Sequence, residues 1–185
     1  MYLLVSCYGV RYARIDAGAN YLQMSQLAVY NTSGSNVAKG KSTTASPVYS
    51  LATCTYYASA GVDGVLVAKT FTNCAYKTYV SADVTGDYWQ VDLGSEQTIN
   101  KVVYYNRADS SSYTRALTYT LTLLNTANQS VCTTGTFTSS LIQDLTLIAG
   151  IPFYLRVLRF TRFYSCNEDH AETNLLYLVL SKSFI

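Results

Sequence analysis

Residues 88–115 constrain the fold of this chain more than any other segment. The segment begins with a short apolar strand pattern that contains the only tryptophan, Trp89, and ends at Gly94. After a predicted turn, β-branched and aromatic residues at 99–105 form a second strand pattern, which runs into an Arg-x-Asp loop at Arg107. Both patterns are typical of β-strands.

Period-two alternation extends this prediction along the chain. In residues 116–125, leucines and a tyrosine alternate with threonines, as in a strand with one buried and one solvated face. Further strands are predicted at 10–15, 22–30, 130–137 and 154–160. Short strands with turns roughly every 10 residues are typical of an all-β sandwich or barrel. The predicted core consists of Trp89, Val91, Leu93, Ile99, Val103, Leu117, Tyr119 and Leu121.

The composition fits one folded domain with a substantial core. Of 185 residues, 49% are apolar and only 13% charged, so serine, threonine, asparagine and tyrosine must supply the polar surface. The 18 tyrosines are expected to fill strands, with interfaces or sugar stacking as the alternative. A net charge of +2 favours no nucleic acid partner. The long irregular stretch 48–85 is where we expect a binding face.

The cysteine pattern argues against a zinc site, because no C-x-x-C pair is present. The five cysteines are Cys7, Cys54, Cys74, Cys132 and Cys166. A Cys54–Cys74 bridge is one alternative, but we expect mainly buried free thiols. The first ten residues do not resemble a secretory signal, and no apolar run reaches membrane length. Sequons at Asn31 and Asn128 matter only in a secretory compartment.

Catalytic chemistry finds little support in the sequence, so we expect no enzyme. The single histidine, His170, lies in a polar stretch with Cys166, Glu168 and Asp169 that is predicted to be a solvated loop. The acidic residues are scattered, so no pair for glycoside hydrolysis can be named. Three arginines spaced by three residues, from 156 to 162, lie in a run too apolar for a phosphate-binding arm.

Several motifs in a fixed order resemble the discoidin, or coagulation factor type C (F5/8 type C), family of galactose-binding-like domains. They are R-Y-A-R-I, Q-L-A-V-Y, N-V-A-K-G-K-S-T-T-A-S, V-D-G-V, D-Y-W-Q-V-D-L-G, I-N-K-V-V-Y-Y-N-R-A-D and R-A-L-T-Y-T-L-T-L-L, within about residues 11–131. The resemblance implies an antiparallel jelly-roll β-sandwich whose loops at one end bind sugars, lipids or proteins. We expect the sandwich at 10–160, an N-terminal extension at 1–9, and a C-terminal extension or final strand at 161–185.

The resemblance also implies a sugar site like that of fucose-binding F-type lectins. Arg107, Asp109 and Arg115 loosely match the basic and acidic residues of that site, with Tyr113 nearby. The upstream histidine of that branch is absent. In the alternative interpretation, Arg107 and Asp109 form a salt bridge that holds the end of the strand. Asp92 is expected to stabilise a turn.

A calcium site is a further implication of the lectin branch, and no other cofactor is expected. The candidate ligands are Asn36, Ser46 and Asp63. Calcium takes six to eight oxygen ligands, and few carboxylates are present at these positions.

The leading hypothesis is a non-enzymatic structural protein in the particle of a large DNA virus, because the motif order resembles discoidin-type proteins of such viruses. A minor capsid component would contact other structural proteins, such as a major capsid protein, or glycans. Residues 1–10 and 175–185 are the candidate docking segments, and the isolated chain is expected to oligomerise or aggregate. The alternative is a secreted or cell-surface lectin of the fucose or galactose type, with a role in adhesion.

Overall fold

The computed structural model describes residues 5–51, 54–70, 79–82, 86–109 and 112–149. The strands are β1 (Cys7–Asp16), β2 (Gln23–Met24), β3 (Gln26–Asn31), β4 (Thr43–Ala45), β5 (Ser50–Leu51), β6 (Cys54–Thr55), β7 (Tyr79–Val80), β8 (Tyr88–Tyr105), β9 (Thr120–Leu124), β10 (Ser130–Thr134), β11 (Ile142–Leu145) and β12 (Leu147–Ala149). Two short 3-10 helices, η1 (Ala58–Val62) and η2 (Tyr113–Thr118), interrupt them.

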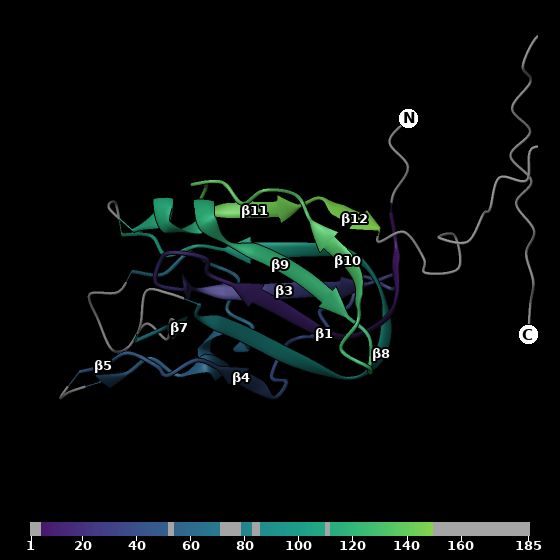
Figure 1. Ribbon diagram of the computed structural model, residues 1–185, viewed down its shortest axis with the longest axis horizontal. Coiled ribbons are helices and arrows are strands. Elements are labelled where there is room, and N and C mark those ends of the chain that lie inside the picture. The colour runs from purple at the N-terminus through teal and green to yellow at the C-terminus, as the bar shows by residue number, and fades with distance from the viewer. Residues whose placement is uncertain (1–4, 52–53, 71–78, 83–85, 110–111, 150–185) are drawn as a thin grey trace, which may run out of the picture.

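Strand β8 is the axis of the fold, because its 18 residues serve both layers of the sandwich. The predicted turn after Gly94 is therefore wrong, since the strand continues through it and curls from one layer to the other (Figure 1). Gly94 adopts φ +88°, a conformation that only glycine adopts readily, and this bends the chain without breaking the sheet. Asp92 Oδ1 accepts a hydrogen bond from the Gly94 amide at 2.8 Å, so the carboxylate predicted to stabilise a turn stabilises this bend within the strand instead.

The two halves of β8 have different antiparallel neighbours. The first half lies between β4 and β1, and beyond β1 follow β9, β10 and β12. The second half lies between β3 and β11. All of these pairings are antiparallel, which confirms the predicted all-β antiparallel sandwich.

The core lies between the layers and is centred on Trp89, which is fully buried. Its indole N–H donates to the carbonyl of Ala58 at 2.9 Å, so the buried polar atom is paired. Gly61 lies so close that an added Cβ would come within 3.1 Å of the tryptophan ring. The alternation predicted most of this core, since Val91, Leu93, Ile99, Tyr119 and Leu121 are buried in it, whereas Val103 is buried in a separate small cluster with Ala28 and Tyr105.

Leu117 is the exception to the predicted core, because 52% of it is exposed. The strand predicted at 116–125 begins only at Thr120, and the preceding residues form η2. A 3-10 helix has three residues per turn, so period two does not hold before Thr120 and Leu117 faces solvent.

A disulfide joins Cys7 at the start of β1 to Cys132 in β10, and both are 1% exposed. The prediction of mainly free thiols is therefore wrong for this pair. The two cysteines are 125 positions apart in the sequence, and that separation does not indicate that they are close in space. Since β1 begins at Cys7, residues 7–9 belong to the sheet rather than to an extension. Cys54 lies in β6, whereas Cys74, Cys166, His170 and the predictions for 154–160 and 175–185 fall outside the described residues.

No helix among the described residues is long and apolar enough to cross a bilayer.

Candidate functional site

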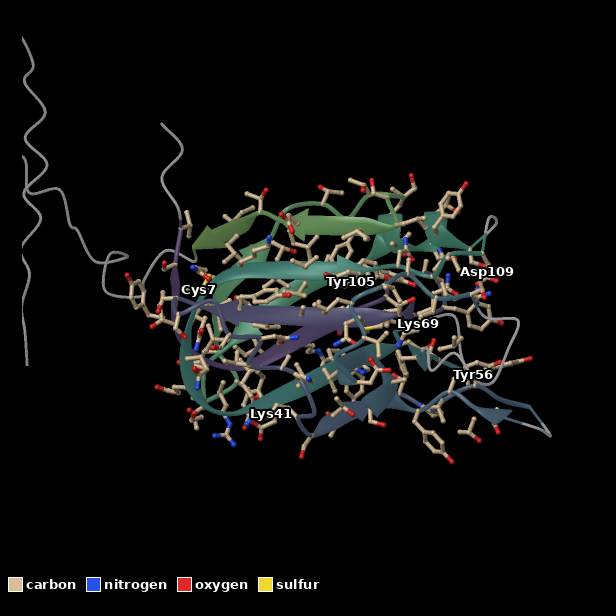
Figure 2. The ribbon with its side chains drawn as sticks, turned by 180° about the vertical axis from the view of Figure 1, so that it is seen from behind. Cys7, Lys41, Tyr56, Lys69, Tyr105 and Asp109 are labelled. Atoms are coloured by element: carbon tan, nitrogen blue, oxygen red, sulfur yellow. A yellow bond between two sulfur atoms is a disulfide. The ribbon has the colours of Figure 1, made fainter. Side chains whose placement is uncertain are left out.

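Loops from distant parts of the chain meet at one end of the sandwich. Figure 2 shows Tyr56, Lys69 and Asp109 at this end, with Cys7 at the opposite end. We call this region the loop end and define it by Tyr21, Gln23, Lys69, Arg107, Asp109, Tyr113 and Arg115. It contains all four residues of the predicted sugar site.

Arg107 and Asp109 form an ion pair, with 2.6 Å between Nε and Oδ2. Their side chains are only 9% and 17% exposed. A second guanidinium nitrogen of Arg107 donates to Gln23 Oε1 at 2.8 Å. The pair therefore has the geometry of the alternative interpretation, a salt bridge that holds the end of β8.

Gln23 connects the two arginines of the predicted site. Its Oε1 accepts hydrogen bonds from Arg107 and, at 3.1 Å, from Arg115, and its amide nitrogen donates to the carbonyl of Ser112 at 2.7 Å. It is fully buried in β2. Sequence reasoning missed this residue, and the available signal was a glutamine between two apolar residues, Leu22 and Met24.

A second set of buried polar groups supports the loops from beneath. The Ser25 hydroxyl donates to the carbonyl of Asn106 at 2.8 Å and accepts the amide of Lys69 at 2.7 Å. The ammonium of Lys69, a residue only 4% exposed, lies 2.8 Å from Asp63 Oδ2. A buried charge is tolerated when it is paired in this way, so these contacts fix the loops rather than leave groups available to a ligand.

Two buried tyrosines complete the support. The Tyr104 hydroxyl donates to the carbonyl of Gln23 at 2.6 Å, and the Tyr119 hydroxyl donates to the carbonyl of Tyr21 at 2.5 Å. Burial raises the pKa of both phenols, so they remain protonated and act as donors at neutral pH. The backbone on both sides of Leu22 is held by these two bonds.

Arg115 is the charged residue of the predicted site that stays open to solvent, because it is only partly buried on η2. Its guanidinium carbon lies 5.1 Å from the centre of the Tyr21 ring. Among the described residues, this guanidinium donates only to Gln23, so further N–H groups remain available. Tyr113 is also half-buried, and its carbonyl accepts the Asn106 amide at 2.9 Å.

The side chains of the three predicted calcium ligands are all engaged in bonds within the protein. Asn36 Oδ1 accepts the backbone amides of Val29 and Ala38, both at 3.2 Å. Ser46 Oγ accepts the amide of Tyr88 at 2.9 Å, and the Asp63 carboxylate is paired with Lys69. In the part of the chain that the structure describes, no three histidine, cysteine, aspartate or glutamate side chains form a possible metal cluster.

Comparison with known proteins places this architecture in a family. A family model described as a NedA-like, galactose-binding domain matches residues 60–157, just over half of the chain. The match covers β8 and the loop that carries Arg107, Asp109 and Arg115. No curated protein and no solved structure matches this chain. The chain belongs to the F5/8 type C family of galactose-binding-like domains.

Proposed function

We propose that the protein is a non-enzymatic carbohydrate-binding module that holds a terminal sugar of the galactose or fucose type at its loop end. The observation that carries this proposal is the half-buried Arg115, which lies over the Tyr21 ring. Among the described residues its guanidinium donates only to Gln23, so its other N–H groups are available to a ligand. Membership of a galactose-binding family supports the same ligand class.

The loop end suits a sugar because its donors are held in place before the ligand arrives. Gln23 orients Arg115, and Arg107 and Ser112 in turn orient Gln23. In the bound state, Arg115 donates charge-assisted hydrogen bonds to ring hydroxyls, and the partly exposed rings of Tyr21 and Tyr113 offer apolar contact. Arg107 and Asp109 position these groups and do not touch the sugar. Pre-organised groups lose little entropy on binding.

A glycan array tests this proposal with and without calcium. We expect the wild-type chain to bind glycans that end in galactose or fucose, equally well in both conditions. Arg115→Ala should weaken that signal by about 10- to 100-fold, because it removes charge-assisted hydrogen bonds.

Lys101→Ala is the matched control, since it removes a cation that is half exposed and paired with Asp144 at 3.2 Å on β8. The control should bind like the wild type. Absence of signal on every glycan, or full binding by Arg115→Ala, would remove the lectin function.

A second candidate is a structural subunit of an assembly, such as a minor capsid protein of a large DNA virus. Exposed apolar side chains favour it: Val65, Leu66 and Val67 are 47%, 42% and 50% exposed, and Tyr57 is 63% exposed. Val65, Leu66 and Val67 are consecutive in the sequence, and exposed apolar residues that lie together are typical of protein contacts. Sedimentation tests it: a wild-type oligomer that Leu66→Ser dissociates supports the subunit, and a wild-type monomer argues against it.

The disulfide bears on where either function takes place. Disulfides persist in oxidising surroundings, such as secreted proteins and particle surfaces, and are rare in the cytosol. Cys7–Cys132 therefore supports a location on a particle surface or outside the cell.

A further inference from the structure

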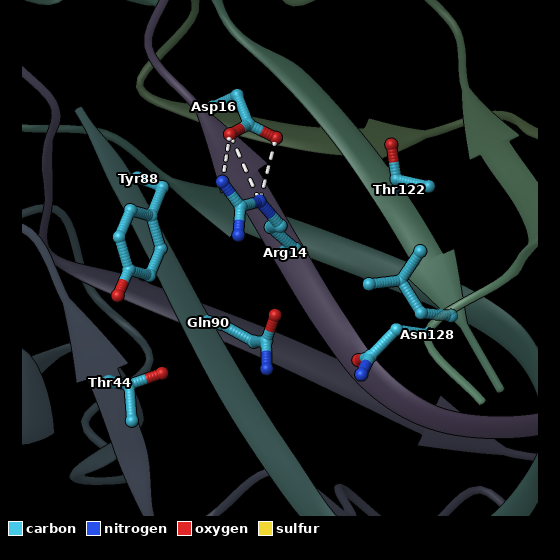
Figure 3. A pocket seen from close by; sticks show the side chains of 8 residues that line it. Arg14, Asp16, Thr44, Tyr88, Gln90, Thr122 and Asn128 are labelled. Carbon is cyan, nitrogen blue, oxygen red and sulfur yellow. Dashed lines mark hydrogen bonds and ion pairs between the residues drawn. The ribbon is translucent and has the colours of Figure 1, made fainter. Parts of the chain in front are cut away.

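A hollow of about 550 Å³ lies on the outer face of the layer formed by β4, β8, β1 and β9 (Figure 3). We call this surface the outer face. Its floor is a row of paired residues on adjacent strands, in the order Thr44, Gln90, Arg14 and Thr122. Residues paired in this way point to the same side of a sheet, and four strands span roughly 14 Å. The floor of the hollow therefore spans four strands and is distinct from the loop end.

The outer face carries charges that cancel one another. Arg14 donates two hydrogen bonds from Nε and one from a terminal nitrogen to the Asp16 carboxylate, at 2.7–3.1 Å. Its guanidinium carbon also lies 4.3 Å from the centre of the Tyr88 ring. An anionic ligand would meet the Asp16 carboxylate and would have to compete for an arginine already engaged. The local electrostatics therefore favour a neutral ligand.

The uncharged polar side chains around the Arg14–Asp16 ion pair have no hydrogen-bond partner among the described residues. The side chains of Thr44, Gln90, Thr122 and Asn128 form no hydrogen bond within the described part of the chain, and all four line the hollow. The two amides can each donate and accept, and the two hydroxyls can do both as well. Together they offer an uncharged partner the mixed donors and acceptors that sugar hydroxyls require.

Asn128 is held at the rim by a defined turn between β9 and β10. It adopts φ +57°, a conformation that asparagine tolerates better than most residues. The Asn125 side-chain oxygen accepts the amides of Ala127 and Gln129 at 3.0 and 2.9 Å, which fixes the turn. The amide of Asn128 is thus presented toward the hollow by the backbone.

We propose that the outer face is a second carbohydrate site, one that binds the interior of an extended neutral polysaccharide. The floor, which spans four strands, accommodates a chain of sugar rings laid across them, whereas the loop end holds a chain terminus. A volume of about 550 Å³ lies within the usual range for small-ligand sites, roughly 300–1,000 Å³. The two sites would allow one module to hold a polysaccharide at two points.

Affinity electrophoresis tests this proposal in gels that contain soluble galactan, mannan, xylan or β-glucan, with polygalacturonate as the anionic counterpart. Excess free galactose and fucose in the gel saturate the loop end, so that the remaining retardation reports on the outer face. We expect the wild type to be retarded in at least one neutral gel. The double variant Gln90→Ala/Asn128→Ala should bind about tenfold more weakly, through loss of two amides that bond hydroxyls.

Thr122→Lys serves as an independent variant, because it places a long charged side chain in the hollow without altering the amides. It should abolish retardation, whereas Arg115→Ala should be retarded like the wild type. The proposal is overturned if no neutral gel retards the wild type, if only polygalacturonate does, or if both outer-face variants behave like the wild type. Failure of Arg115→Ala to affect the glycan array would reject the loop-end function and leave this result intact.

Discussion

The loop end and the outer face use similar side chains in opposite ways. Each contains an arginine over a tyrosine ring, a neighbouring carboxylate and a glutamine. At the loop end, Gln23 is fully buried and bonded to two arginines. On the outer face, Gln90 is half-buried and no described residue bonds its side chain. The polar groups of the loop end therefore bond one another and stabilise its structure, whereas those of the outer face remain available to a ligand or to water.

This contrast changes which residues of the predicted sugar-binding motif should contact a ligand. Arg107 and Asp109 match the motif in sequence, but their charges are engaged with each other and largely shielded from solvent. Only Arg115 combines the motif with access. A residue that matches a binding motif can thus be part of the support for the site.

Loss of Arg107 should have the largest effect on stability. Arg107→Ala removes the ion pair to the largely buried Asp109 carboxylate and one of the two guanidinium donors to Gln23 Oε1, so the free energy of unfolding should fall by about 3–5 kcal/mol. Arg14→Ala, on the outer face, should cost at most about 1 kcal/mol, because Arg14 and Asp16 are 35% and 41% exposed. Urea unfolding of both variants measures the difference, and equal losses would refute the contrast.

The disulfide ranks next and lies at the end opposite the loops. The double variant Cys7→Ser/Cys132→Ser should lower the free energy of unfolding by about 2–4 kcal/mol, since the unfolded chain regains the freedom of a long loop. Because the loop end is fixed by its own bonds, sugar affinity should not change below the unfolding transition. Thermal unfolding and binding measured on the same sample test this. A large loss of affinity in the folded variant would show that the loop end depends on the far end of the sandwich.

The two glutamines give the most direct comparison. Gln23→Ala removes the acceptor of two guanidinium groups and should cost about 1–3 kcal/mol. Gln90→Ala removes an amide with no protein partner and should change stability by no more than about 0.5 kcal/mol. Both can be measured by the midpoint of urea unfolding. If Gln90→Ala proves as costly as Gln23→Ala, the outer face is part of the scaffold and not an open site.

Local patterns explain why much of the fold was predictable from the sequence. Alternation around Trp89 and in residues 120–124 reports directly on which side chains face the core. The corner at Gly94 was predicted as a turn because a glycine after a strand usually ends it. Whether the chain turns or bends there depends on the pairing of the first half of β8 with β1 and β4 and of its second half with β3 and β11, which no local pattern encodes.

The site was predictable only in its local part. Arg107 and Asp109 are two residues apart, so their ion pair follows from a motif within one loop. Gln23 lies 84 positions from Arg107, and its position between the two arginines is set by the packing of β2 against the loops. The Cys7–Cys132 bridge spans 125 positions and was missed for the same reason. Contacts at such separation result from the tertiary fold rather than from any spacing rule.

The smallest expected effect concerns Leu117, on the solvent side of the loop end. Leu117→Ala should change the free energy of unfolding by no more than about 0.5 kcal/mol, because the side chain is 52% exposed on η2. The matched variant Leu121→Ala should cost about 2–5 kcal/mol, since that leucine is 1% exposed in β9. Similar costs for the two leucines would mean that β9 includes Leu117, so that this part of the loop end is a strand of the sheet and not η2. A negligible cost at Leu117 would instead indicate that substitutions on the exposed surface of η2 are tolerated. The hydrogen bonds between Gln23, Arg107 and Arg115 would then be unaffected by changes on that surface.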